Sequence, residues 1–319
     1  MRALIQEYMV SSQYFAPRGK ERLMFLGEQI AQRPLSYNDR LIGIVGDAGS
    51  GKSSLIKGMF PGLELANDED VIHSRKIMQV RSLSDDWHDS TTFHIDMRFQ
   101  TAFTQMFEIV AWVQDLLAHR RRVIVEHFNL LYPALGRNAD IILGIGEEII
   151  VSRPSVFGPL PESIYQIVHT SLKFRKMAHT AEDVTMQTLE DEYGIAENRY
   201  FSSDVRNGFV LKFKEKPEIN LDELEQRVKE RLARHLEVSY FDEGHIRLGD
   251  KVIPCDGSRF HVRNTSEITD FSLARHFIFD AKTNTHCLVG LIDKYTENLD
   301  NRNTQYFLTR KCSGDNNEQ

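Results

Sequence analysis

The sequence predicts an α/β domain followed by an α+β domain, and three observations support this. In the first half, short apolar runs of strand length alternate with amphipathic runs of helical length. Such strand–helix–strand alternation is typical of a parallel sheet wrapped by helices. After a proline-rich segment at 152–163, two long helical runs are interspersed with further strands, which favours an α+β domain.

The elements of the first half follow in order. Leu23, Leu26 and Ile30 recur at helical intervals, and Pro34 ends that helix. The apolar run 40–46 closes on glycine, which indicates a buried strand entering a tight turn. Further strands are expected at 63–68, 121–128 and 140–153, and further helices at 53–60 and 102–120.

The expected helix at 102–120 is amphipathic. Its apolar side chains at helical spacing predict one buried face. That face is expected to consist of Phe103, Phe107, Val110, Val113 and Leu117.

The second half has a different pattern of helices and strands. A helical pattern runs to Gly194, a strand follows at 208–214, and a charged helix at 220–237. Strand-like runs follow at 245–255, 271–280 and 286–293. The expected organisation is therefore a helical lead-in at 1–38, a nucleotide-binding domain at 39–165, an α+β domain at 166–312 and a disordered tail at 313–319.

The composition narrows the class of protein. No apolar run approaches the roughly 18 residues that a membrane helix needs, and Glu7 interrupts what would be a secretory signal. The three cysteines are too few for a disulfide framework, which favours a reducing, cytoplasmic compartment. A net charge of −7 argues against a globally basic nucleic-acid binder, although a local basic face stays open.

One motif carries a specific chemistry. Gly46, Gly51, Lys52 and Ser53 satisfy the pattern G-x-x-x-x-G-K-[ST], between an expected strand and an expected helix. Glycines let backbone N–H groups turn inward on a phosphate, the lysine reaches the β/γ phosphates, and the serine hydroxyl binds Mg²⁺. No N-K-x-D string for guanine is present, so ATP with Mg is the expected ligand. The expected binding residues are Gly46, Asp47, Ala48, Gly49, Ser50, Gly51, Lys52, Ser53 and Ser54.

Further polar residues are candidates for the same site. Glu126 ends an apolar strand, where an acid would hold the Mg²⁺ shell, or it is an ordinary strand-end charge. Asp68 and Asp70 follow an expected strand, where they would deprotonate an acceptor hydroxyl or belong to a solvated loop. Arg153 would close over the phosphates or is a surface arginine. The stretch 93–100 offers side chains that would face an acceptor, with a purely structural role as the alternative for the histidine: His94, Asp96 and Arg98.

The first half resembles the P-loop kinase-like fold, near uridine kinases, over residues 39–165. This resemblance implies ATP-dependent phosphoryl transfer, in which Lys52, Asp68, Asp70 and Glu126 would be catalytic. About 125 residues leave little room for a full lid and acceptor pocket, so transfer and hydrolysis both stay open.

The second half resembles the alanyl-tRNA editing family over about residues 166–295. The stretches that carry the resemblance are "HTAEDVTMQTLEDEYGI" (179–195), "LDELEQRVKERLARHLEV" (221–238) and "HIRLGDKVIPCDGSRFHVRNTSEI" (245–268). They are similar to the second additional domain shared by alanyl- and threonyl-tRNA synthetases and free-standing editing proteins.

In that family two histidines on a helix, a cysteine and a further histidine bind zinc. The resemblance implies His179, Asp183 in place of the second histidine, and Cys255. The fourth position is Arg259 without a gap or His261 with a two-residue insertion, and the insertion is preferred because "HVRNT" then stays in register. Residues four apart on a helix share one face, which supports a site. The alternative is a fold that persists without its metal, with Cys255 a buried apolar residue.

These features lead to one main expectation and two alternatives. The main expectation is an ATP-binding phosphotransferase or ATPase whose second domain recognises an aminoacyl-tRNA end, or a smaller amino-acid or nucleoside acceptor. The alternatives are a metal-dependent aminoacyl-tRNA deacylase regulated by nucleotide, and a nucleotide-gated binding module without chemistry. Because Asp183 replaces a neutral imidazole, ester hydrolysis at a family-like rate is not expected.

Overall fold

The computed structural model describes residues 11–15, 20–63, 65, 92–205, 207–255 and 260–293. The chain divides into two compact units, Met1–Ser171 and Leu172–Gln319, which we call unit 1 and unit 2. The division falls after residue 171 rather than after residue 165. The reason is that Ile164 and Val168 are buried in the core of unit 1, so their whole helix belongs to that unit.

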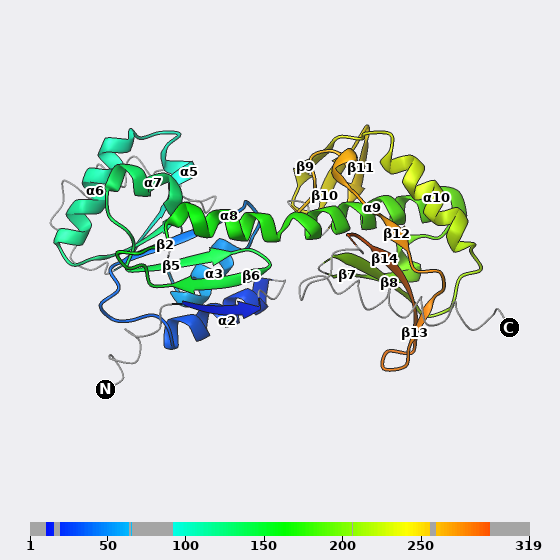
Figure 1. Cartoon of the computed structure of the whole chain (residues 1–319), viewed down its shortest axis with the longest axis horizontal. Coiled ribbons are helices and arrows are strands. Elements are labelled where there is room, and N and C mark those ends of the chain that lie inside the picture. Colours follow the sequence, from blue (N-terminus) through cyan, green and yellow to red (C-terminus); the bar gives the residue numbers. More distant parts are fainter. Residues whose placement is uncertain are drawn as a thin grey trace. The chain divides into compact units, whose positions relative to one another are not determined.

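Unit 1 contains a six-stranded sheet in the order β1-β6-β5-β2-β4-β3 (Figure 1). The four strands β3, β4, β2 and β5 run parallel, whereas β6 is antiparallel to β5 and β1 is antiparallel to β6. The fold is thus α/β with a largely parallel sheet. The strands are β1 (Ser11–Phe15), β2 (Leu41–Gly46), β3 (Thr92–Asp96), β4 (Arg122–Glu126), β5 (Ile141–Ile145) and β6 (Glu148–Ser152).

Helices cover both faces of this sheet (Figure 1). One apolar layer packs α6, α7 and α8 on the sheet, and the other packs α2 and α3. This explains why the central strands are apolar on both faces. The helices are α2 (Lys20–Gln32), α3 (Lys52–Met59), α5 (Met97–Gln100), α6 (Met106–Ala118), α7 (Phe128–Leu135) and α8 (Pro161–Ser171).

The expected buried face of α6 is wrong in part. Its buried residues are Ile109, Val113 and Leu116, whereas Phe103 and Phe107 are 56% and 72% exposed. The helix begins only at Met106, because the preceding turn caps it through Gln105 and Glu108. Phe103 therefore lies outside the helix and is not on its apolar stripe.

Two other expected segments also differ. Leu63 and Leu65 are not in a strand. The other residues of the strand expected at 63–68 lie outside the described residues. β4 pairs with β2 on one side and with β3 on the other. The proline-rich segment 152–163 does not separate the two units, because it continues from β6 into α8 of unit 1.

Unit 2 is an α+β domain. One antiparallel sheet has the order β11-β10-β9, and a second has the order β12-β14-β8-β7 with β13 paired to β14. Figure 1 shows the long helix α9 beside both sheets, and its apolar face joins their common core. The elements are α9 (Lys173–Tyr193), β7 (Tyr200–Val205), β8 (Gly208–Phe213), α10 (Leu221–Leu232), β9 (Val238–Asp242), β10 (His245–Leu248), β11 (Lys251–Pro254), β12 (Ser272–Leu273), β13 (Ile278–Asp280) and β14 (Thr285–Leu291).

Local sequence accounts for the ends of the helices in unit 2. Gly194 ends α9 in the left-handed conformation with φ of 64°, which favours glycine. Asn220 begins α10, and its side-chain oxygen accepts hydrogen bonds from the N–H groups of Asp222 and Glu223. Within the described residues, no helix is long and apolar enough to span a membrane.

Candidate functional site

The glycine loop, residues Gly46–Ser54, leaves the carboxyl end of β2, the strand that lies between β4 and β5. The chain goes from β2 toward β3 on one side and from β5 to β6 on the other, so the connections of these two neighbouring strands diverge at this edge of the sheet. In open α/β sheets, ligands bind at such a point. Gly46, Gly49 and Gly51 have φ of 155°, 77° and 94°, conformations that favour glycine.

Several hydrogen-bonding groups of the loop have no partner within the loop itself. The Ser50 N–H donates to the Asp47 carbonyl at 3.2 Å, and the next bond is the first of α3, from Leu55 N–H to Gly51. In the described part of the chain, the N–H groups of Gly51, Lys52 and Ser53 make no backbone bond. The Ser50 hydroxyl is buried there without a partner. These donors suit a phosphate group.

Lys52 is buried beneath the loop with 6% of its side chain exposed. Its Nζ donates to the Asp47 carbonyl at 2.9 Å and lies 3.4 Å from the Gly46 carbonyl. It is also 3.8 Å from Oε2 of Glu126. Burial lowers the pKa of Lys52, and the Glu126 charge opposes this. The Lys52 ammonium therefore contacts both the loop backbone and the Glu126 carboxylate.

Glu126 joins three groups from separate segments. It lies on β4 opposite Ile44 of β2, which places its carboxylate beside the glycine loop. Its Oε1 accepts from the Ser53 hydroxyl at 3.3 Å and is 3.2 Å from Nε2 of His94. Burial alone would raise the pKa of Glu126, but the His94 hydrogen bond and the Lys52 charge lower it. Glu126 is therefore held as a carboxylate next to the Ser53 hydroxyl.

A second acid lies beside Glu126. Asp96 ends β3 in register with Glu126, and these two carboxylates and the His127 ring offer atoms within 4.8 Å of one another. Burial, then the Lys52 charge, lowers the pKa of His127 to about 3, so its ring is neutral. Asp68 and Asp70, the acids expected in this role, lie outside the described residues. In the described part of the chain, the acid at the carboxyl end of β3, which pairs with β4 on the side away from β2, is Asp96.

Helix α8 contacts the glycine loop through Asp47. Oδ1 of Asp47 lies 2.8 Å from Nδ1 of His169 and accepts a hydrogen bond from the Tyr165 hydroxyl at 3.3 Å. The two rings stack, with centroids 5.5 Å apart. No local pattern in the sequence marks this contact, because more than a hundred residues separate its partners.

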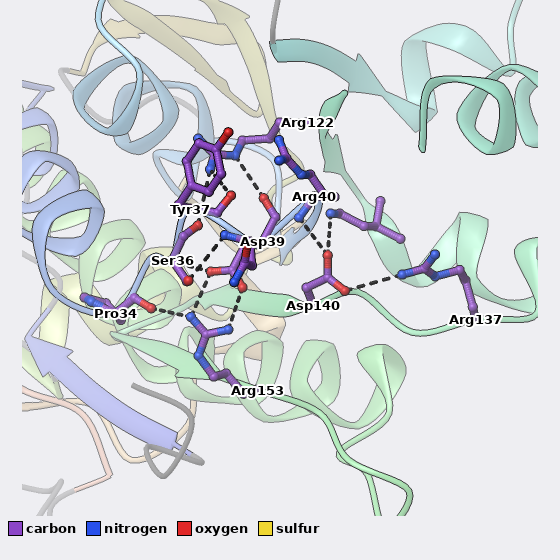
Figure 2. A network of polar contacts seen from close by, with 11 residues as sticks. Pro34, Ser36, Tyr37, Asp39, Arg40, Arg122, Arg137, Asp140 and Arg153 are labelled. Atoms are coloured by element: carbon purple, nitrogen blue, oxygen red, sulfur yellow. Dashed lines mark hydrogen bonds and ion pairs between the residues drawn. The ribbon is translucent and has the colours of Figure 1, made fainter. Parts of the chain in front are cut away.

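Arg153 does not lie near the glycine loop, which corrects the expectation that it closes over the phosphates. Its Nη1 and Nη2 donate to Asp39 at 2.6 and 2.8 Å, and it also bonds the Pro34 carbonyl (Figure 2). Asp39 precedes β2, whereas the loop follows it, so the two lie at opposite edges of the sheet. The cause is the antiparallel direction of β6, which carries its last residue, Ser152, back to Ile142 near the start of β5.

Unit 2 brings together the four residues implied for zinc. His179, Asp183, Cys255 and His261 offer ligand atoms that all lie within 4.8 Å of one another. The first two lie one turn apart on α9, Cys255 follows β11, and His261 lies on the segment beyond it. The structure thus brings His261 into the cluster, whereas Arg259, the other candidate for the fourth position, lies outside the described residues.

Two distances between ligand atoms in this cluster match those expected for a tetrahedral arrangement of ligands around a metal ion. Bonds of about 2.3 Å to sulfur and 2.05 Å to nitrogen place those atoms about 3.6 Å apart around zinc. Cys255 Sγ lies 3.5 Å from Nε2 of His179 and 3.6 Å from Nε2 of His261. The third edge is shorter, since Asp183 Oδ2 lies 2.7 Å from Nε2 of His261, a hydrogen-bonding distance.

The surroundings of the cluster also fit a metal. Nδ1 of His179 lies 3.2 Å from the Phe260 carbonyl, which leaves Nε2 facing Cys255. Burial lowers the pKa of His179, so its ring is neutral as a metal ligand must be. A cavity of about 40 Å³ adjoins Asp183, with Glu190, Tyr200 and Ile253 in its lining.

Comparison with known proteins gives no family assignment. No protein-family model matches the chain. No curated protein matches it significantly either.

Proposed function

We propose that unit 1 is a P-loop domain of kinase-like fold that binds ATP with Mg²⁺ and transfers or hydrolyses the terminal phosphate. One observation carries this proposal. Lys52 and Ser53, from the glycine loop, both contact Glu126, which is 73 residues away from Ser53. A glycine-rich turn without a ligand would not need a lysine and a serine placed on one buried carboxylate.

The residues present fit the proposed ligands. The unpaired amides of the glycine loop and Lys52 would hold the phosphates, and the Ser53 hydroxyl and Glu126 offer the oxygens that Mg²⁺ prefers. Bound Mg²⁺ would supply charge neutralisation on the phosphates. Asp96, which lies beside Glu126, would accept the proton of an acceptor hydroxyl or of water. His94 holds the Glu126 carboxylate in position.

The test is the Lys52→Ala variant. We expect it to lose ATP·Mg²⁺ binding in calorimetry, because the ammonium that would meet the phosphates is gone. Lys57→Ala is the matched control, since Lys57 lies in the last turn of the same helix α3. Wild-type affinity in Lys52→Ala would refute the proposal.

For unit 2 we propose a zinc-binding domain, similar to the second additional domain of alanyl-tRNA synthetase, that recognises an aminoacyl ester or a related small acceptor. The convergence of His179, Asp183, Cys255 and His261 supports it. With four protein ligands the ion would have no open position, as in structural zinc sites. Binding of the ester without rapid cleavage is therefore the favoured activity, and metal-dependent deacylation is the alternative.

Two measurements test this second proposal. Metal analysis of the purified protein should find one zinc per chain, reduced in Cys255→Ala. Incubation with seryl-tRNA(Ala) and added Zn²⁺ should show slow ester loss. Rapid loss that disappears in Cys255→Ala would establish the deacylase instead.

A further inference from the structure

Arg98 lies at the edge of the sheet where the glycine loop begins its helix. It is the second residue of α5, directly after β3. Asp96 Oδ1 accepts hydrogen bonds from the N–H groups of Arg98 and Phe99 at 2.9 and 3.2 Å. The same carboxylate group lies within 4.8 Å of that of Glu126, which contacts Lys52 and Ser53. The backbone of Arg98 is therefore fixed close to the proposed phosphate site.

The Arg98 side chain is accessible to solvent, and its guanidinium is available to bind an anion. It is exposed, and in the described part of the chain its guanidinium has no hydrogen bond or ion pair. An arginine on a helix surface commonly pairs with a nearby acid, yet Asp96, two residues away, takes the backbone N–H of Arg98 instead. The guanidinium is thus left without a partner beside a cluster of charged groups.

The charge of Arg98 affects the pKa of groups on three other segments around the loop. Burial chiefly lowers the pKa of Lys52 and of His127, and the Arg98 charge lowers both further. Burial chiefly raises the pKa of Tyr165 on α8, and the Arg98 charge opposes this. These three residues come from α3, the residue that begins α7, and α8, and α5, which carries Arg98, packs against α7. Figure 1 shows α5 next to α7 in unit 1.

The balance of charge indicates why a second cation is needed there. Three carboxylates surround the loop, those of Asp47, Asp96 and Glu126, against one ammonium on Lys52. A triphosphate brings further negative charge, which the acids would repel. Mg²⁺ and one more fixed cation would offset that repulsion. Arginine suits this place because its guanidinium stays charged and offers several N–H donors to phosphate oxygens.

We infer that Arg98 contacts the terminal phosphate of the nucleotide held by the glycine loop, the role that the sequence had assigned to Arg153. The inference rests on the proposed nucleotide site. The terminal phosphate is favoured because Arg98 is bonded through its N–H to Asp96, which lies beside Glu126. Glu126 contacts Lys52, the lysine that reaches the β/γ end of a nucleotide in such loops. The guanidinium would donate hydrogen bonds to the phosphate oxygens.

The test compares ATP and ADP by calorimetry in the presence of Mg²⁺, on the full chain. Arg98→Ala should weaken ATP binding about tenfold, the lower end for hydrogen bonds to charged groups, and leave ADP binding within twofold. Arg98→Lys should lie between Arg98→Ala and the wild type for ATP. Arg137→Ala is the matched control, because Arg137 is half-exposed and bonds Asp140 at the opposite edge (Figure 2). Its affinities should match the wild type.

The other outcomes separate this inference from the function on which it rests. If the wild type binds ATP and Arg98→Ala binds it equally well, the assignment of Arg98 is wrong while the nucleotide site stands. If ATP and ADP binding weaken equally, Arg98 does not act on the terminal phosphate. If the wild type binds neither nucleotide, the proposed site and the role of Arg98 both fail. Thermal unfolding of each variant shows whether the fold survives.

Discussion

Removing the Arg153 guanidinium should destabilise unit 1 without weakening nucleotide binding. Arg153 bonds both carboxylate oxygens of Asp39, whose side chain is 5% exposed, and Arg153 itself is 19% exposed. Arg153→Ala leaves the Asp39 charge buried and short of partners. This matters because breaking a buried ion pair costs more than breaking a surface one.

The magnitude follows from what Asp39 would retain. Removing one partner of a buried pair typically costs about 3–5 kcal/mol. Asp39 keeps the Ser36 N–H at 2.6 Å, and the space left by the arginine admits water, so we expect about 2–3 kcal/mol. For a unit of this size that corresponds to a decrease in melting temperature of roughly 4–12 °C. ATP affinity should not change, because the pair lies at the edge opposite the glycine loop.

Urea unfolding followed by tryptophan fluorescence measures this effect in unit 1. Both tryptophans of the chain, Trp87 and Trp112, belong to that unit. Arg137→Ala is the control, because its pair with Asp140 is 52% and 31% exposed and should contribute less than about 1 kcal/mol. An unchanged unfolding midpoint together with weaker ATP binding would refute the reasoning and restore Arg153 to the phosphate site.

Three further predictions concern the two sites. Gly51→Ala should abolish ATP binding and destabilise unit 1, because the residue has φ of 94° and a Cβ would meet Leu23 at 2.3 Å; calorimetry and thermal unfolding check this. Asp96→Asn should not weaken ATP binding and should keep the cap of α5, but it should slow phosphate release by about a hundredfold, and an unchanged rate would exclude Asp96 as the base. Chelating zinc should lower the thermal stability of unit 2, and Cys255→Ala should not respond to the chelator, which differential scanning calorimetry would show.

Sequence alone predicted the features that depend on neighbouring residues. The glycine loop is one, since its positive φ angles and its place between a strand and a helix are local requirements. The end of α9 at Gly194 and the shared face of His179 and Asp183 are others, because helix geometry sets them. These positions needed no knowledge of distant contacts.

Tertiary structure decided which distant residues meet the local ones. The direction of β6 takes Arg153 to Asp39, and the pairing of β3 with β4 brings Asp96 beside Glu126 and fixes Arg98 nearby. No local pattern distinguishes two arginines that each follow a strand. Strand order and direction separate them, because only the carboxyl ends of the parallel strands lie at the same edge as the glycine loop.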